Sequence, residues 1–116
     1  FSSYFDTTGI DDLWQPTPVS WIMPALASCP PWLTATDNTV AVRQCKHPDV
    51  AALCELTGQP LISTSANPSG MKPATSALQA HRHFHGRVDM ILVNDAYSSW
   101  RPSSVRRYAT QQVIRT

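Results

Sequence analysis

The sequence predicts an α/β domain built on an open β-sheet, and two observations lead to this prediction. Short apolar, β-branched segments alternate with segments of helical pattern, which is typical of helices packed on a sheet. Hydrophobic residues make up 42% of the 116 residues and the formal net charge is +1, a composition that argues against intrinsic disorder. Because 116 residues suffice for one core but not for two, residues 1–116 are expected to form a single domain.

The predicted strands are short runs of apolar and β-branched residues bounded by turn-forming residues. The first run has prolines on both sides, and the second begins after Thr39 and ends in an arginine at the rim of the sheet. The second, third and fourth runs are expected to form the core of the sheet, and the tail to form two short strands around Thr110-Gln111. In chain order the runs are Val19–Met23, Val40–Arg43, Leu61–Ser65 and Val88–Val93.

Two helices and one helical turn are predicted between these strands. His47-Pro48 opens the first helix, and Gly58 suits the left-handed position that ends it. Ser76 and Gln79 form a capping box at the start of the second helix, which is expected to extend to Gly86. A shorter helical turn is expected at Pro30–Thr34.

The most informative segment for function is the hydroxyl-rich run that follows Leu61-Ile62. Ser63, Ser65 and Asn67 alternate along the chain, so an extended backbone would project two hydroxyls and an amide to the same side. Polar groups gathered where a strand leaves the sheet either satisfy the backbone of the following turn or bind a ligand. Both interpretations are open at this point.

Arginines at other strand ends favour the ligand interpretation. Arg43 ends one predicted strand, and Ser103 and Arg115 enclose the tail. A guanidinium presents a planar set of donors suited to phosphate or carboxylate. Residues 1–80 hold three basic against six acidic residues, whereas residues 81–116 hold six arginines against two aspartates, so the last third is basic and compatible with an anionic ligand such as a nucleotide or RNA.

Other chemistry is not indicated. His81 and His85 would share a helix face, but no acidic residue or cysteine lies close in sequence to complete a metal site, so no metal is predicted. Three cysteines without a CxxC pair are expected to be reduced thiols. Walker and dinucleotide motifs are absent, as are a signal peptide and an apolar run long enough to span a membrane, so a cytoplasmic protein is expected.

Several motifs occur in the order and spacing seen in YrdC-like proteins, from about Pro16 onward. The most specific are Ala41-Val42-Arg43 and Ser63-Thr64-Ser65-Ala66-Asn67, and the others are Pro18-Val19-Ser20 with Pro24-Ala25, Pro31–Thr34, His47-Pro48, Ser69-Gly70, Pro102-Ser103 and Ile114-Arg115. The chain therefore resembles the L-threonylcarbamoyl-adenylate synthases. The resemblance implies an open, twisted mixed sheet with flanking helices. It also implies an enzyme that joins L-threonine, bicarbonate and ATP, with Mg²⁺ on the phosphates and no tightly bound cofactor, for tRNA modification.

The resemblance also implies roles for individual residues. Arg43 would hold the carboxylate of threonine together with Ser63 and Ser103. ATP would be bound by a second set, and a Ser-x-Asn pair would line the place where bicarbonate and the triphosphate meet. The ATP set is Thr39, Ser65 and Arg115, and the Ser-x-Asn pair is Ser65 and Asn67.

Departures from the family pattern limit what the chain is expected to do alone. Thr17 and Gln111 stand where the family has glycine, and Arg107 stands where it has aspartate. The family's N-terminal segment, with its Lys-x-Arg pair, is not in this sequence, so the chain is expected to be an incomplete and inactive member. The alternative is a non-catalytic half-domain that binds double-stranded RNA, tRNA or a protein partner. In either case the surface left exposed is expected to be covered in a homodimer.

Overall fold

A computed structural model describes residues 3–8, 18–94 and 103–116 of the chain. The chain divides into two compact units, one made of Phe1–Pro60 with Ser103–Thr116 and the other of Leu61–Pro102. We call them the sheet unit and the central unit, and each is described by itself. The single domain predicted from the length stays a prediction.

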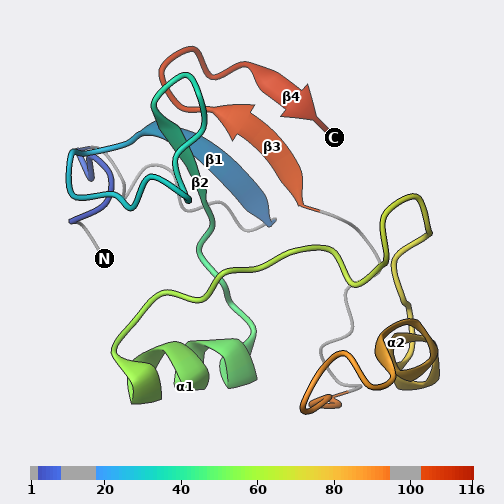
Figure 1. Ribbon diagram of the computed structural model, residues 1–116. Helices are drawn as coiled ribbons and strands as arrows, with labels where there is room; N and C mark the ends of the chain where they lie inside the picture. The colour runs from blue at the N-terminus through green and yellow to red at the C-terminus, as the bar shows by residue number, and fades with distance from the viewer. Residues whose placement is uncertain (1–2, 9–17, 95–102) are drawn as a thin grey trace. The chain divides into compact units, whose positions relative to one another are not determined.

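The sheet unit contains a four-stranded mixed sheet (Figure 1). Its strands are β1 (Val19–Pro24), β2 (Thr39–Val42), β3 (Ser104–Arg107) and β4 (Val113–Arg115), in the spatial order β2-β1-β3-β4. The β1–β2 and β3–β4 pairs are antiparallel, whereas β1 and β3 are parallel. The predicted α/β class with an open mixed sheet is thus confirmed, as are the first strand, the second strand through Val42 and the paired strands of the tail.

Alternation along β1 places the core on one face of the sheet. Val19, Trp21 and Met23 are buried, with Trp21 2% and Met23 0% exposed, whereas the residues between them are half-buried. This is the period of two expected for a strand with one covered face. The remaining buried hydrophobic residues of the cluster are Phe5, Ala25, Cys29 and Val40.

Two further sequence predictions in the sheet unit are confirmed. Residues 30–34 form a helical turn, in which the Leu33 amide donates to the Pro30 carbonyl over 2.9 Å. Helix α1 (Pro48–Thr57) starts with proline in its first turn and ends at Gly58, whose φ of 65° lies in the left-handed region. None of the residues of α1 is buried; Val50, Ala51 and Cys54 are half-buried, and Leu56 is 84% exposed.

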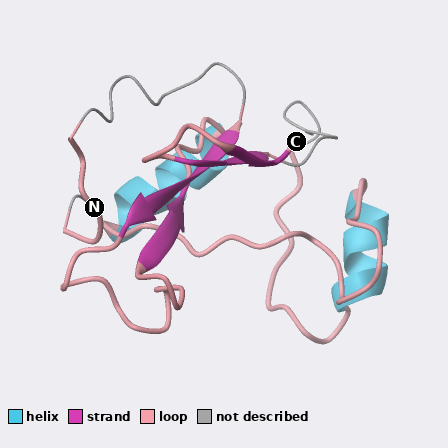
Figure 2. Ribbon diagram, turned by 90° about the horizontal axis from the view of Figure 1, so that it is seen from above, coloured by secondary structure: helices cyan, strands magenta, loops and turns pink. Residues whose placement is uncertain are grey.

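The central unit contains helix α2 (Ala77–Phe84), which is labelled in Figure 1; helices are drawn in cyan in Figure 2. Its start matches the predicted capping box, because the Ser76 hydroxyl accepts from the Gln79 amide at 3.2 Å. The Gln79 side chain in turn accepts from the Thr75 amide at 2.8 Å. Two backbone donors at the helix start are therefore satisfied, although Gln79 accepts from the amide of Thr75, the residue before the cap, rather than from that of Ser76 as in the usual capping box.

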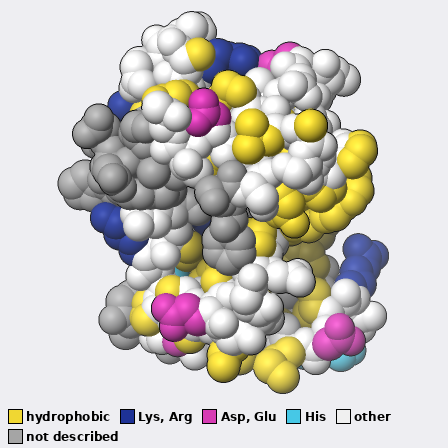
Figure 3. Space-filling view, turned by 90° about the vertical axis from the view of Figure 1, so that its left-hand side faces the viewer, with side chains coloured by type: hydrophobic (Ala, Val, Ile, Leu, Met, Phe, Trp, Pro, Cys, Tyr) yellow, Lys and Arg dark blue, Asp and Glu magenta, His cyan; other side chains and the backbone are white. Residues whose placement is uncertain are grey.

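Two predicted core strands are wrong. Leu61–Ser65 and Val88–Val93 contain no strand, and their apolar side chains are largely exposed, with Ile62 70% and Met90 74% accessible. Figure 3 shows hydrophobic side chains at the surface on one side of the molecule. A strand needs a partner for its backbone hydrogen bonds, and composition alone does not supply one.

Candidate functional site

Three of the predicted site residues lie at one end of the sheet. Arg43 directly follows Val42, the last residue of β2, which pairs with Trp21. Ser103 precedes Ser104, which pairs with Val19 at the start of β1, and Arg115 ends β4 opposite Val105. The end of β2, the starts of β1 and β3 and the end of β4 thus meet at the end from which the chain leaves for α1 (Figure 1). The sheet topology brings Arg43, Ser103 and Arg115 to the same end of the sheet.

Ser103 is the most deeply buried polar residue at this end of the sheet. It is 8% exposed, and its hydroxyl oxygen lies 2.9 Å from the hydroxyl oxygen of Ser20 on β1. The Arg115 guanidinium donates to the Ser103 carbonyl oxygen at 3.3 Å. These contacts hold two of the predicted substrate-binding residues together and fix the direction of the Ser103 hydroxyl. Ser20 belongs to the Pro18-Val19-Ser20 motif, but no role was predicted for it, because its partner is 83 residues away in sequence.

Arg43 is exposed and makes no hydrogen bond or ion pair with the described residues. A guanidinium without a protein partner can still donate to an incoming anion. The predicted role of Arg43 as a ligand for a carboxylate is compatible with this position.

Thr39 lies at the opposite end of β2 from Arg43, and its hydroxyl is hydrogen-bonded to a carboxylate. The Thr39 hydroxyl donates to Asp37 at 2.6 Å, and the Arg107 guanidinium lies 3.2 Å from the other oxygen of the same carboxylate. The hydrogen bond from Thr39 and then the contact with Arg107 lower the pKa of Asp37. Arg107, which departs from the family pattern, therefore compensates the negative charge beside Thr39.

Gln111 and Thr17 are the two positions at which this sequence lacks the glycine of the family pattern. Gln111 has a φ of 55°, so the last hairpin keeps a left-handed residue where the family has glycine. Thr17 lies outside the described residues.

The hydroxyl-rich run belongs to the central unit. Ser63 and Ser65 are exposed, and the chain turns at the Asn67 amide, which donates to the Ser65 carbonyl at 2.9 Å. The Asn67 side-chain amide donates to the Pro68 carbonyl at 3.0 Å, while its Oδ1 atom is buried and has no partner among the described residues. The run therefore satisfies part of its own backbone, and the hydroxyls of Ser63 and Ser65 have no partner among the described residues. The structure supports the turn interpretation, and ligand binding by this run stays a prediction.

The predicted site residues thus fall in both units. The sheet unit carries Arg43, Ser103, Arg115 and Thr39, and the central unit carries Ser63, Ser65 and Asn67. The carboxylates of the described residues do not form a metal site, since no group of three or more histidine, cysteine, aspartate or glutamate residues is placed to hold an ion. Cys29 is buried, and Cys45 and Cys54 are half-buried; all three are free thiols. Among the described helices, none is long and apolar enough to cross a membrane.

The structure defines an α/β domain whose open mixed sheet carries guanidinium and hydroxyl groups at one end. Comparison with known sequences identifies the family. The family model Sua5/YciO/YrdC, described as "Telomere recombination", matches residues 7–116. The chain belongs to this family, and the resemblance drawn from its motifs is confirmed.

Curated relatives carry the name threonylcarbamoyl-AMP synthase. The chain is 42% identical to the protein of Pseudomonas putida strain W619 over 100 residues, which cover 86% of this chain and 54% of that protein. It is 44% identical over 100 residues, with the same coverage, to the protein of Pseudomonas aeruginosa strain UCBPP-PA14. The chain spans about half the length of the curated relatives it matches.

Proposed function

We propose that this chain provides part of the substrate site of a threonylcarbamoyl-AMP synthase. The observation that carries the proposal is the meeting of Arg43, Ser103 and Arg115 at one edge of the sheet, in a chain of the Sua5/YciO/YrdC family. The substrates are L-threonine, bicarbonate and ATP, and the product serves tRNA modification in the cytoplasm.

Threonine is held by Arg43, Ser63 and Ser103 in this proposal. The exposed Arg43 guanidinium pairs with the carboxylate, and the Ser103 hydroxyl, fixed by Ser20, supplies a hydrogen-bonding group of defined direction. A buried hydroxyl held by a neighbour loses little freedom on binding, which favours recognition of a small polar ligand.

ATP is bound by Thr39, Ser65 and Arg115, and Asn67 acts with Ser65 where the carbamate meets the triphosphate. The threonine amine adds to bicarbonate with loss of water, or to carbon dioxide with loss of a proton, and an oxygen of the resulting carbamate attacks the α-phosphorus while pyrophosphate leaves. Such a step depends on alignment and charge neutralisation rather than on a strong base. Mg²⁺ enters bound to the triphosphate, because the described residues offer hydroxyls and guanidinium groups rather than a carboxylate cage.

The residues of this chain bind substrates in the proposal but do not complete the reaction. The chain spans 54% of the length of the Pseudomonas putida relative. The Lys-x-Arg pair that the resemblance implies is not among the 116 residues. Loss of one such preorganised charge-stabilising group costs about 10²- to 10³-fold in rate. Purified 116-residue chain is therefore expected to release no pyrophosphate in response to threonine and bicarbonate. Self-association to a twofold dimer is expected of the same chain and would be measured by light scattering.

Isothermal titration of L-threonine and of ATP into the purified chain tests the proposal. Arg43→Ala is expected to weaken threonine binding by about 1.5 to 3 kcal/mol, the usual contribution of a hydrogen bond to a charged group. Arg82→Ala removes an exposed arginine from α2 in the central unit and serves as the matched control, with unchanged affinity expected. Equal affinities of wild type and Arg43→Ala would contradict the threonine site.

RNA binding is a second candidate function, favoured by three arginines in one hairpin. Arg106 and Arg107 lie on β3, and Arg115 ends β4. Cations on a short hairpin suit a phosphate backbone, and binding of that kind weakens steeply with salt. Titration with double-stranded RNA and with tRNA at two salt concentrations measures it. Loss of RNA affinity in Arg106→Ala with threonine affinity retained would separate the two functions.

A further inference from the structure

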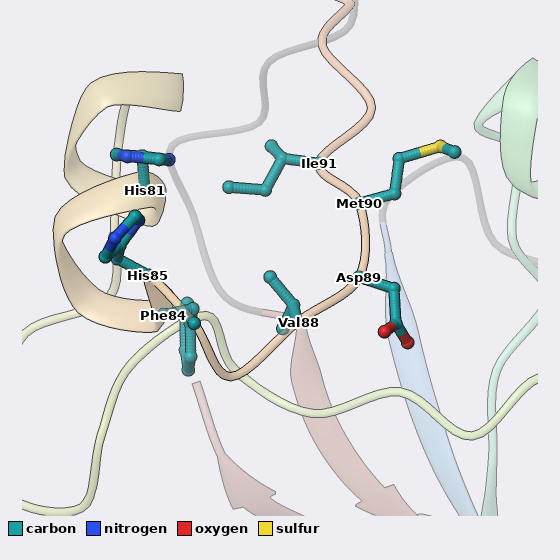
Figure 4. A pocket seen from close by; sticks show the side chains of 8 residues that line it. His81, Phe84, His85, Val88, Asp89, Met90 and Ile91 are labelled. Carbon is teal, nitrogen blue, oxygen red and sulfur yellow. The ribbon is translucent and has the colours of Figure 1, made fainter.

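The histidines at the end of α2 form a pair that nothing in the proposed synthase site uses. His81 and His85 are four residues apart, and their ring centroids lie 4.8 Å from one another with the rings tilted by 57°. Both side chains are exposed. Figure 4 shows them next to each other on the α2 side of a hollow of 310 Å³, with Val88 and Ile91 on the other side.

The separation of the two rings agrees with the geometry of a shared metal ion. An imidazole nitrogen lies about 2.0 to 2.1 Å from zinc, and the ring centroid lies about 1.1 Å behind that nitrogen by the ordinary geometry of the ring. Two imidazoles on one ion at about 90 to 109° therefore have centroids about 4.5 to 5.2 Å apart. The observed 4.8 Å falls inside this interval, so the two rings lie at a separation that one ion can bridge.

The position on the helix also favours a cation. Helix α2 ends at Phe84 and His85 is its C-cap, so the pair spans the last turn. The carbonyl groups of a last helical turn give that end a partial negative charge. Exposed imidazoles can turn about their side-chain bonds, so their nitrogens can reach one ion at little cost.

From these observations we propose that His81 and His85 form a two-histidine site for a late divalent transition metal ion. Imidazole nitrogen suits Cu²⁺, Ni²⁺ and Zn²⁺ as a ligand. Of these three ions, Cu²⁺ is expected to bind most tightly. The remaining coordination positions are open to water or an added ligand. Asp89 lines the same hollow, but Figure 4 shows its carboxylate pointing away from the two rings.

His83 provides a matched control on the same helix. Its ring makes an edge contact with Phe84, with centroids 6.1 Å apart, and it is half-buried rather than exposed. Residues two positions apart on a helix do not face each other, so His83 cannot share an ion with either member of the pair. His83→Ala therefore removes one histidine without touching the proposed site.

Isothermal titration of NiCl₂ and of CuCl₂ into the tag-free chain tests the proposal. Wild type and His83→Ala are expected to bind one ion per chain. His81→Ala and His85→Ala each lose an inner ligand, and we expect at least about a tenfold loss of affinity, since even the loss of an outer partner costs that much. These variants keep all three cysteines and the other histidines, so binding that persists in them at wild-type affinity would place the ion elsewhere and overturn the proposal. Absence of binding in wild type, or an equal loss in His83→Ala, would overturn it as well.

Two further measurements protect the test from folding artefacts. Far-UV circular dichroism of each variant shows whether α2 is retained, and His85→Gln offers a polar replacement should His85→Ala unfold. Electron paramagnetic resonance of the Cu²⁺ complex counts the coordinated nitrogens. Two imidazole nitrogens are expected in wild type and in His83→Ala, and one in His85→Gln, whereas one in wild type would contradict a shared ion.

Discussion

The sheet unit and the central unit both contain apolar runs of strand-like composition, but only one of them buries such runs. The sheet unit holds every described residue classed as buried, from Phe5 to Ser103. The described residues of the central unit include none that is buried and no strand, although Leu61-Ile62 and Val88–Val93 resemble β1 in composition. The difference lies in pairing, because β1 has a partner on each side whereas the apolar runs of the central unit have none within it.

Helices and strands differ in the same way across the two units. Helix α2 forms in the central unit without a buried residue, since its backbone bonds and its cap are local. A strand has no such local supply of hydrogen bonds. Local sequence therefore suffices for α2 but not for a strand at Leu61–Ser65.

Core substitutions should give the largest contrast between the units. Trp21→Ala removes a side chain that is 2% exposed, and we expect it to lower the free energy of unfolding by about 3 to 5 kcal/mol. Ile62→Ala in the central unit, where the side chain is 70% exposed, should stay within about 0.5 kcal/mol. Urea denaturation followed by circular dichroism measures both. A similar loss in the two variants would show that Ile62 is buried in the folded protein.

Removal of the cap of α2 should have a smaller effect that stays in the central unit. Ser76→Ala deletes the hydroxyl that accepts from the Gln79 amide, and we expect a loss of about 1 kcal/mol of helix stability. Amide hydrogen exchange should show faster exchange at Ala80, whose amide donates to the Ser76 carbonyl at 2.9 Å. Ser69→Ala, an exposed serine before the helix, is the control and should change nothing. Faster exchange in β1 would indicate that the two units unfold together.

Relief of backbone strain in the last hairpin should stabilise the sheet unit slightly. Gln111 adopts a φ of 55°, which is unfavourable for a residue with a Cβ, and Gln111→Gly should raise the free energy of unfolding by about 0.5 to 1 kcal/mol. The matched control is Gln112→Gly in the same turn, where φ is not positive and glycine should destabilise. Thermal unfolding compares the two. A higher melting temperature for Gln112→Gly would contradict the strain at Gln111.

The smallest expected effect is a pH dependence at Asp37. The hydrogen bond from Thr39 and the contact with Arg107 lower the pKa of Asp37 from its ordinary value of 3.8. A lowered pKa in the folded state stabilises the protein above that ordinary value, and the contribution is lost as pH falls through the lower folded value. Wild type should therefore lose more stability than Asp37→Asn between pH 4 and pH 2, where pH 4 is about the ordinary carboxyl value. Parallel curves for the two proteins would contradict the network.

The sequence predicted those parts of the fold that depend on neighbours in the chain. Pro48 and Gly58 mark the ends of α1, and Ser76 with Gln79 marks the start of α2. The alternation in Val19–Pro24 identifies a strand with one buried face. The failures at Leu61–Ser65 and Val88–Val93 share one cause, since no local signal states whether a β-branched run finds a partner.

The candidate site was also predictable only in part, namely for the residues that belong to family motifs. Arg43, Ser103 and Arg115 were identified from family motifs, and the sheet places them at one edge. Ser20 and Asp37 were not identified as site residues, because their partners Ser103 and Arg107 lie 83 and 70 residues away. Contacts between residues so distant in sequence depend on strand order, which the composition of a single strand does not contain.

The parallel pairing of β1 with β3 has a consequence for synthesis on the ribosome. The β1–β2 hairpin can form early, but the partner of Val19 is Ser104, so one edge of β1 stays open while the intervening residues are made. With 83 residues between Ser20 and its partner Ser103, translation at about 5 to 20 residues per second leaves this edge open for roughly 4 to 17 s. During that time a nascent hairpin with an unpaired edge is a substrate for chaperones or for another chain, and this edge closes only when β3 has been made and pairs with β1.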